Sequence, residues 1–146
     1  MKVSIASDHA GFEEKQLLVA YLEELGHEAI DRGPENDDRV DYPDFAALVA
    51  HDVVDGAAER GVLVCGTGIG MAVAANKVRG IRAANVTTPE FAALAREHND
   101  ANIVTVSARF IDDATNRAIV KTFLETEFGG GRHAGRVEKI AQLEQE

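Results

Sequence analysis

The segment that decides the fold is Val62-Leu63-Val64-Cys65-Gly66-Thr67-Gly68-Ile69-Gly70-Met71. Its first four residues form a continuous apolar run, which is typical of a central β-strand covered by helices on both faces. Three alternating glycines follow, and residues 69–77 after them favour a helix. A buried strand, a glycine-rich turn and a helix in this order indicate one unit of a parallel α/β sheet.

The same alternation of short β-branched runs and amphipathic stretches continues on both sides of this segment. It predicts strands at residues 3–6, 27–31, 62–65, 81–86 and 102–106. It predicts helices at residues 12–25, 45–53, 69–77, 89–97 and 114–126, and a last one with Val137, Ile140, Ala141 and Leu143 on one side. We therefore predict an α/β fold with one domain, residues 1–146. This domain is a three-layer αβα sandwich around a doubly wound, five-stranded parallel sheet of the Rossmann-like type, with an extra C-terminal helix.

The composition is that of a globular protein. Of the 146 residues 45% are hydrophobic, which excludes a disordered chain. No apolar run approaches the roughly 18 residues that a membrane span needs, and no secretory type of apolar stretch follows Met1. A single cysteine cannot form an internal disulfide, and a lone thiol without an export signal favours the cytoplasm.

The net charge of −10 is unevenly distributed along the chain. Residues 1–60 hold 15 acidic and 5 basic side chains, whereas residues 61–146 hold 10 of each. A negative field repels nucleic acids, anionic membranes and phosphorylated metabolites, so we expect neither a nucleic acid nor a membrane as a partner. Any phosphate site therefore requires a local cluster of arginines or backbone N–H groups.

Ligands of doubly wound sheets bind beyond the carboxyl ends of the strands. This rule selects Ser7-Asp8-His9 after the first strand and the glycine loop that follows Cys65 after the third. Glycines allow a close approach of the backbone, and the free N–H groups at a helix start favour an anion. The loop matches neither the dinucleotide fingerprint nor the P-loop, and a tight turn without a ligand remains the alternative.

Cys65 stands where the strand meets this loop. The start of a helix favours the thiolate form of a cysteine, which makes its sulfur a candidate base. A lone cysteine is also commonly an inert, buried apolar residue, and the residues alone leave both interpretations open.

The histidines and arginines give weaker signals. None of the five histidines has the spacing of a metal site and one cysteine is too few for structural zinc, so we predict no metal and no other cofactor. His98 lies between a predicted helix and a strand, where a plain turn explains the composition equally well. Arg132 and Arg136 are four residues apart, so a helix places both on one face, where they either bind phosphate or face solvent.

Several longer motifs occur together in a fixed order over the whole chain. They are Ser7-Asp8-His9-Ala10-Gly11, Asp41-Tyr42-Pro43, Cys65-Gly66-Thr67-Gly68-Ile69-Gly70, Ala74-Ala75-Asn76-Lys77, Gly80-Ile81-Arg82-Ala83, Arg96-Glu97-His98-Asn99-Asp100 and Gly130-Gly131-Arg132-His133. In these motifs the chain resembles the ribose-5-phosphate isomerase B family, which also includes galactose-6-phosphate and allose-6-phosphate isomerases. The resemblance implies an aldose–ketose isomerase, an intramolecular oxidoreductase that interconverts ribose 5-phosphate and ribulose 5-phosphate through an enediolate.

The resemblance also implies roles for individual residues. Cys65 would transfer the proton between the sugar carbons, His98 would be the acid that opens the sugar ring, and Thr67 would assist ring opening. The implied substrate contacts, together with the donors of the glycine loop, are Asp8, His9, Gly66, Gly68, Ile69, Gly70, Asn99, Arg109, Arg132 and Arg136. In one branch of the family a glutamate after the last glycine of the loop is the base. Met71 stands there in this chain, which leaves the role to Cys65.

The direction of the helix before His98 predicts a shared site. This helix runs away from the strand ends that hold Asp8 and Cys65, and ten helical residues cover about 15 Å. We therefore expect a two-fold partner to supply His98 and Asn99, in a homodimer that some members of the resembled family pair into a dimer of dimers. Two other functions stay open: a hexose 6-phosphate isomerase of the allose or galactose type, and a non-catalytic phosphate-binding module.

Overall fold

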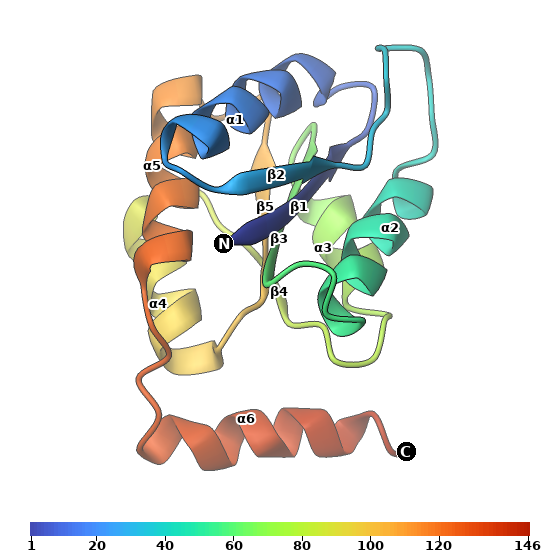
Figure 1. Cartoon of the computed structure of the whole chain (residues 1–146). Helices are drawn as coiled ribbons and strands as arrows, with labels where there is room; N and C mark the ends of the chain where they lie inside the picture. Colours follow the sequence, from blue (N-terminus) through green and yellow to red (C-terminus); the bar gives the residue numbers. More distant parts are fainter.

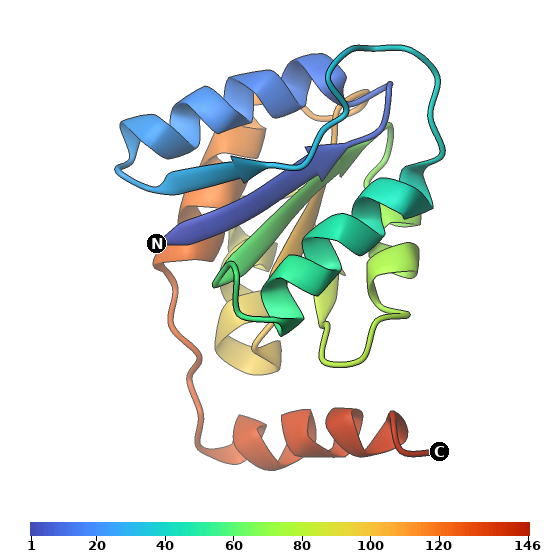
Figure 2. The same ribbon diagram turned by 45° about the vertical axis from the view of Figure 1, so that its right-hand side comes forward.

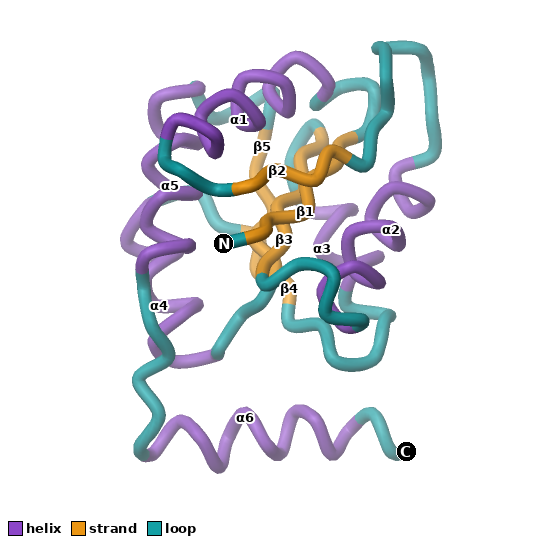
Figure 3. The backbone as a smooth tube through the Cα atoms, viewed as in Figure 1, coloured by secondary structure: helices purple, strands orange, loops and turns teal.

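The computed structural model describes residues 1–146, and at its centre five parallel strands form one sheet (Figure 1, Figure 3). The strands are β1 (Lys2–Ser7), β2 (Glu28–Asp31), β3 (Arg60–Cys65), β4 (Ala83–Asn85) and β5 (Ile103–Ser107). Their order in the sheet is β2-β1-β3-β5-β4, and every pair of neighbours is parallel. The predicted five-stranded parallel sheet is confirmed.

Six helices surround the sheet: α1 (Phe12–Glu24), α2 (Tyr42–Val54), α3 (Ile69–Ala75), α4 (Pro89–Asn99), α5 (Asp113–Glu125) and α6 (Arg132–Leu143). Helices α1, α4 and α5 cover one face of the sheet, and α2 and α3 cover the other (Figure 2). This arrangement is the predicted three-layer sandwich, and α6 is the predicted extra helix.

The hydrophobic core consists of two apolar clusters, one on each face of the sheet. The larger cluster joins strand residues such as Ile5 to Leu18 of α1 and Phe123 of α5. The smaller joins Leu63 of β3 to Val49 of α2. Both faces of β1, β3 and β5 are covered, so a rigid core holds the carboxyl ends of these strands in place.

Local side-chain bonds explain where the element boundaries differ from the sequence prediction. Strand β4 is shorter than predicted because the Asn102 side chain accepts the Arg82 N–H at 2.8 Å and donates to the Gly80 carbonyl at 2.8 Å. A side chain thus satisfies backbone groups that a longer strand would pair in the sheet. Helix α4 extends to Asn99 and ends at Asp100, which adopts a left-handed conformation with φ of 48°. His98 therefore lies in the last turn of a helix and not in the predicted connection.

Helix α6 lies apart from the sandwich, beneath the amino ends of the strands (Figure 1, Figure 2). None of its residues is buried, and Ile140 and Leu143 expose 42% and 62% of their surface. Its packing against the rest of the subunit involves α4. A helix that buries no apolar residue on its own subunit leaves an apolar face without a partner. No helix in the chain combines the length and the apolar character needed to cross a membrane.

Candidate active site

The carboxyl ends of β1 and β3 form the switch point of the sheet. The two strands are neighbours, with Ser7 paired to Val64, but the chain leaves β1 towards α1 on one face and β3 towards α3 on the other. Loops that diverge in this way leave a crevice between them, where doubly wound proteins bind ligands. The structure therefore brings the predicted residues Asp8, His9 and Cys65 to one place.

Cys65 is the last residue of β3, and its sulfur faces the glycine loop. The side chain is 5% exposed and belongs to the smaller apolar cluster. Its Sγ accepts a hydrogen bond from the Gly68 N–H at 3.1 Å. The geometry is that of a sulfur with a polar partner and not of one surrounded only by hydrocarbon.

The glycine loop has the conformation that its glycines permit. Gly68 has a φ of 83°, and a Cβ at this position would lie 3.1 Å from the Val106 backbone and in collision with the Asn85 side chain. A Cβ at Gly70 would lie 2.8 Å from the ring of Tyr42, which stands at the start of α2. Both positions require the smallest residue, so the loop is held close to β5 and α2 by its own sequence.

The backbone donors of this loop divide into two groups. Thr67 Oγ1 accepts the Ile69 N–H at 3.1 Å, and the Gly68 N–H is used by the cysteine sulfur. The N–H groups that remain without a protein acceptor are those of Gly66, Thr67, Gly70 and Met71. The predicted anion-binding loop therefore has fewer free N–H donors than its sequence suggests. The N–H groups of Gly68 and Ile69 form hydrogen bonds within the loop.

Asp8 and His9 approach the loop from β1. Asp8 is 8% exposed, and one of its carboxylate oxygens accepts the Gly11 N–H at 2.9 Å, which fixes the turn into α1. His9 Nδ1 accepts the Val40 N–H at 3.3 Å. That bond leaves Nε2 as the ring nitrogen that carries a proton and can donate to a ligand.

Arg109 completes this half of the site. It lies in the loop after β5, and a Cβ on Gly66 would stand 3.2 Å from its Nη1, so the guanidinium lies across the glycine loop. Arg109 is exposed and forms no ion pair. An unpaired guanidinium beside free backbone N–H groups is a suitable anion site in a chain of net negative charge.

The predicted residues His98, Asn99, Arg132 and Arg136 lie at the other end of the strands, near their amino ends. His98 and Arg132 line a cavity of about 700 Å³ together with Gly129, Gly130 and His133. The rings of His98 and His133 stack with centroids 4.4 Å apart. Desolvation and the nearby charges of His98, Arg132 and Arg136 lower the pKa of His133. Glu97 acts in the opposite direction, and Glu125 and Glu127 also line this cavity, so cationic and anionic side chains face each other there.

One subunit does not bring Cys65 and His98 together. His98 is near the end of α4, which leads to the amino end of β5. There the Gly61 N–H of β3 donates to the Asn102 carbonyl at 3.0 Å. Cys65 is four strand residues beyond Gly61, a distance of roughly 13 Å along the sheet. None of the cavities of the subunit includes Cys65. The structure therefore separates the candidate residues into two groups, which we call half-sites, one at the carboxyl ends of the strands and one at their amino ends.

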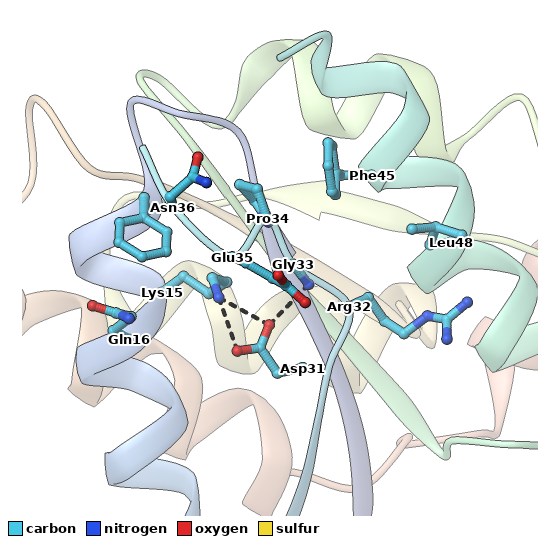
Figure 4. A pocket seen from close by; sticks show the side chains of 11 residues that line it. Lys15, Gln16, Asp31, Arg32, Gly33, Pro34, Glu35, Asn36, Phe45 and Leu48 are labelled. Atoms are coloured by element: carbon cyan, nitrogen blue, oxygen red, sulfur yellow. Dashed lines mark hydrogen bonds and ion pairs between the residues drawn. The ribbon is translucent and has the colours of Figure 1, made fainter. Parts of the chain in front are cut away.

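The largest cavity, about 750 Å³, belongs to neither half-site (Figure 4). It lies at the end of β2, between α1 and α2, and the apolar side chains of Phe45 and Leu48 form one wall. At its base Lys15 Nζ bonds both carboxylate oxygens of Asp31, at 2.9 and 2.8 Å. Because this carboxylate already neutralises the lysine, the cavity has no free cationic group at its base to bind a phosphate.

Two residues of the half-sites had no assigned role in the sequence analysis. His133 was visible only as part of the Gly130-Gly131-Arg132-His133 motif, and its stacking on His98 depends on how residues 126–131 cross the end of α4. Ser107 ends β5 opposite Cys65 and had no distinguishing pattern around it.

Comparisons with known proteins find relatives over nearly the whole chain. The family model described as Ribose/Galactose Isomerase matches residues 3–140. A probable ribose-5-phosphate isomerase B of Mycoplasma pneumoniae is 47% identical over 145 residues, which cover 99% of this chain and 95% of that protein. The ribose-5-phosphate isomerase B structure of Clostridium thermocellum has a TM-score of 0.98 and 47% identity, and covers 99% of this chain and 98% of that one. The structure of a ribose-5-phosphate isomerase B of Mycoplasma genitalium with bound ribulose-5-phosphate has a TM-score of 0.95 and 44% identity. The match covers 99% of this chain and 97% of that one.

Proposed function

The chain belongs to the ribose/galactose isomerase family, and from this premise we propose that it interconverts ribose 5-phosphate and ribulose 5-phosphate through an enediolate. The observation that carries the proposal is the position of the Cys65 sulfur. It accepts the Gly68 N–H at the carboxyl edge of the sheet, beside a loop with further free N–H groups. A base and donors for an oxyanion thus face one region.

The reaction requires one proton to move between adjacent carbons of the open-chain sugar. In the proposed mechanism the Cys65 thiolate removes the proton from the carbon next to the carbonyl and returns it to the neighbouring carbon. The enediolate that forms between these steps carries negative charge on oxygen. The free N–H groups of Gly66, Thr67, Gly70 and Met71 are the donors of this loop that can stabilise it.

Ring opening precedes the proton transfer, and we assign it to His98 as the acid with help from Thr67. An imidazole is the most common general acid of enzymes, and His98 lies in the last turn of α4, where it lines a cavity beside His133. Asp8 and Asn99 are the proposed contacts of the sugar hydroxyl groups.

The phosphate group of the substrate needs positive partners, and His9, Arg109, Arg132 and Arg136 are the proposed ones. Arg132 and Arg136 lie four residues apart at the start of α6, and neither forms an ion pair with a carboxylate. Guanidinium groups bind phosphate oxygens in pairs of parallel hydrogen bonds, which suits them to this task.

The separation of the half-sites supports a homodimer in which each subunit completes the site of the other. A two-fold operation places the amino edge of one subunit at the carboxyl edge of its partner without any change of fold. The unburied helix α6, with Ile140 and Leu143 exposed, offers apolar surface for such an interface. The dimer brings His98, Asn99, Arg132 and Arg136 to the partner's Cys65.

Mixing two inactive variants tests the shared site. Cys65→Ala and His98→Asn subunits form mixed dimers that hold one intact site and one doubly defective site. Statistical exchange makes half of the dimers mixed, so we expect about a quarter of the wild-type activity to return. If native mass spectrometry demonstrates mixed dimers and no activity returns, the sites are not shared.

An assay with two substrates tests the function itself. We expect the purified protein to convert ribose 5-phosphate with a higher kcat/KM than allose 6-phosphate. The reverse preference would identify a hexose 6-phosphate isomerase, and no turnover of either sugar would favour a non-catalytic phosphate-binding module. Alkylation of Cys65 should abolish turnover and sugar phosphate should protect the thiol, whereas a module that only binds phosphate does not need this sulfur.

A further inference from the structure

Ser107 stands at the point where β5 reaches the candidate active site. It is the last residue of β5, it is paired with Cys65 across the sheet, and it is 3% exposed. The chain continues from Cys65 into the glycine loop and from Ser107 into the loop that carries Arg109. The two loops that hold the proposed base and a proposed phosphate ligand therefore start side by side.

The hydroxyl group of Ser107 connects these two loops. It donates to the Gly66 carbonyl at 2.7 Å and accepts the Phe110 N–H at 3.0 Å. The Arg109 N–H also donates to the Gly66 carbonyl, at 3.1 Å. Only a group that both donates and accepts can make the two side-chain bonds, and a hydroxyl is the smallest side-chain group that does so.

A second set of bonds holds Ser107 from the side of α5. The side-chain amide of Asn116 donates to the Ser107 carbonyl at 2.9 Å, and Asn116 is fully buried. Asp112 precedes the same helix as its N-cap, and its side chain accepts the Thr115 N–H at 2.8 Å. The segment between Ser107 and Asp112 is thus fixed at both ends, and the bonds of the serine hydroxyl hold its middle together with the backbone bonds from Ala108 to Cys65 and from Arg109 to Gly66.

We propose that Ser107 is a positioning residue that sets the distance between the Cys65 sulfur and the Arg109 guanidinium through its bridge from Gly66 to Phe110. This inference rests on the proposed function, in which Cys65 reacts with one end of the sugar and Arg109 binds the phosphate at the other. The side chain of Ser107 does not touch the substrate. Its effect is to hold the two groups at a fixed spacing.

The test compares Ser107→Ala with Ser4→Ala. Ser4 is also a buried strand serine, and its hydroxyl donates to Asp52 at 2.7 Å, towards the amino end of β1. We expect Ser107→Ala to lower kcat/KM for ribose 5-phosphate by about 10–10²-fold, the scale of a small misplacement of reacting groups. Ser4→Ala should lower the melting temperature to a similar degree and leave kcat/KM unchanged. If the two variants have the same kcat/KM, Ser107 has only a structural role.

A double-mutant cycle with Arg109 supplies a readout that lost stability would not move. If Ser107 acts through the Arg109 loop, Ser107→Ala should change kcat/KM by less than about 3-fold once Arg109 is replaced by alanine. Full additivity of the two substitutions contradicts the proposal. Ser107→Thr keeps the hydroxyl group and should recover most of the activity lost in the alanine variant.

The wild-type protein separates failure of this inference from failure of the proposed function. Absence of sugar phosphate isomerisation by the wild-type protein refutes both, because the positioned groups then have no such reaction to serve. An active wild-type protein with an unimpaired Ser107→Ala variant refutes the positioning role alone and leaves the isomerase assignment intact.

Discussion

Glu14 and Asp113 make the stability of the fold depend on pH, and Glu14→Gln tests this. Glu14 is on α1 and Asp113 is the first residue of α5, and the Asn116 amide reaches the Glu14 carboxyl at 3.4 Å. Arg117 bonds one oxygen of Asp113 at 2.7 Å, and the other oxygen, Oδ1, is buried without a partner. A protonated Glu14 supplies the hydrogen that this oxygen needs.

Burial, followed by the hydrogen bond and the charge of Asp113, raises the pKa of Glu14 from 4.5 to about 7. Asn116 and Arg117 act in the opposite direction and lower it. Because the native state holds the proton more tightly than the unfolded chain, the stabilisation is complete below pH 4.5 and is lost as the pH rises through 7. At about 1.36 kcal/mol for each pKa unit, the upper bound on this contribution to the free energy of unfolding is about 3.4 kcal/mol. Glu14 is only half-buried, so solvent screening reduces the expected loss to about 1–2 kcal/mol.

Urea unfolding at several pH values measures this effect. Glutamine imitates the protonated acid, since its amide can donate to Asp113 and its carbonyl can accept from Asn116. Between pH 5 and pH 8 we expect the free energy of unfolding of the wild type to fall by about 1–2 kcal/mol relative to Glu14→Gln. Glu13→Gln removes the same charge from an exposed position in the same helical turn and should follow the wild type. The protein concentration must be constant, because dimerisation shifts apparent stability. Parallel curves for the wild type and Glu14→Gln would refute the shared proton.

Three further predictions concern other parts of the chain. Cys65→Ser retains the size of the side chain but not its acidity, so kcat should fall by about 10²–10⁴-fold with the melting temperature unchanged. A kcat near the wild-type value would exclude the thiolate as the base. Asp31→Asn leaves the buried Lys15 ammonium without its counter-charge and should cost about 3 kcal/mol in urea unfolding, whereas adding Lys15→Met should restore much of this loss. Gly68→Ala should lower the free energy of unfolding by about 1–3 kcal/mol, and by more than Gly56→Ala does. Gly56 has a similar φ of 81°, but no atom lies within 4 Å of a Cβ added there. Equal losses for the two variants would show that only backbone strain matters.

The element order was predictable because the local patterns and the tertiary fold agree. The run of residues 62–65 is apolar on both sides, and the structure covers β3 with helices on both faces. The boundaries that differed depend on distant partners. The start of β4 is set by the side chain of Asn102, about twenty residues further along the chain, and no window of sequence around residue 82 contains that information.

The site was predictable to the level of which strand ends carry it. The rule for parallel sheets placed Asp8 and Cys65 together, and the pairing of Ser7 with Val64 confirms that the two strand ends are adjacent. The hydrogen bond from Gly68 to the sulfur was not predictable, because it depends on the φ of one residue. The Glu14–Asp113 contact was not predictable either, because it depends on how α1 packs on α5 across about a hundred residues of sequence.

The division of the site between two edges also has an electrostatic consequence. Arg132 and Arg136 lie near the two stacked histidines at one end of the strands, where desolvation acts together with their charges, and against Glu97, to lower the pKa of His133. If Arg109 belonged to the same end of the strands, one subunit would carry a third guanidinium group beside Arg132 and Arg136, and the added repulsion would oppose folding. In the proposed dimer this repulsion arises only when the two edges meet, and the substrate phosphate, which carries negative charge, removes it. Substrate binding and subunit association therefore favour each other, because a ligand that binds only the assembled site stabilises the assembly by mass action.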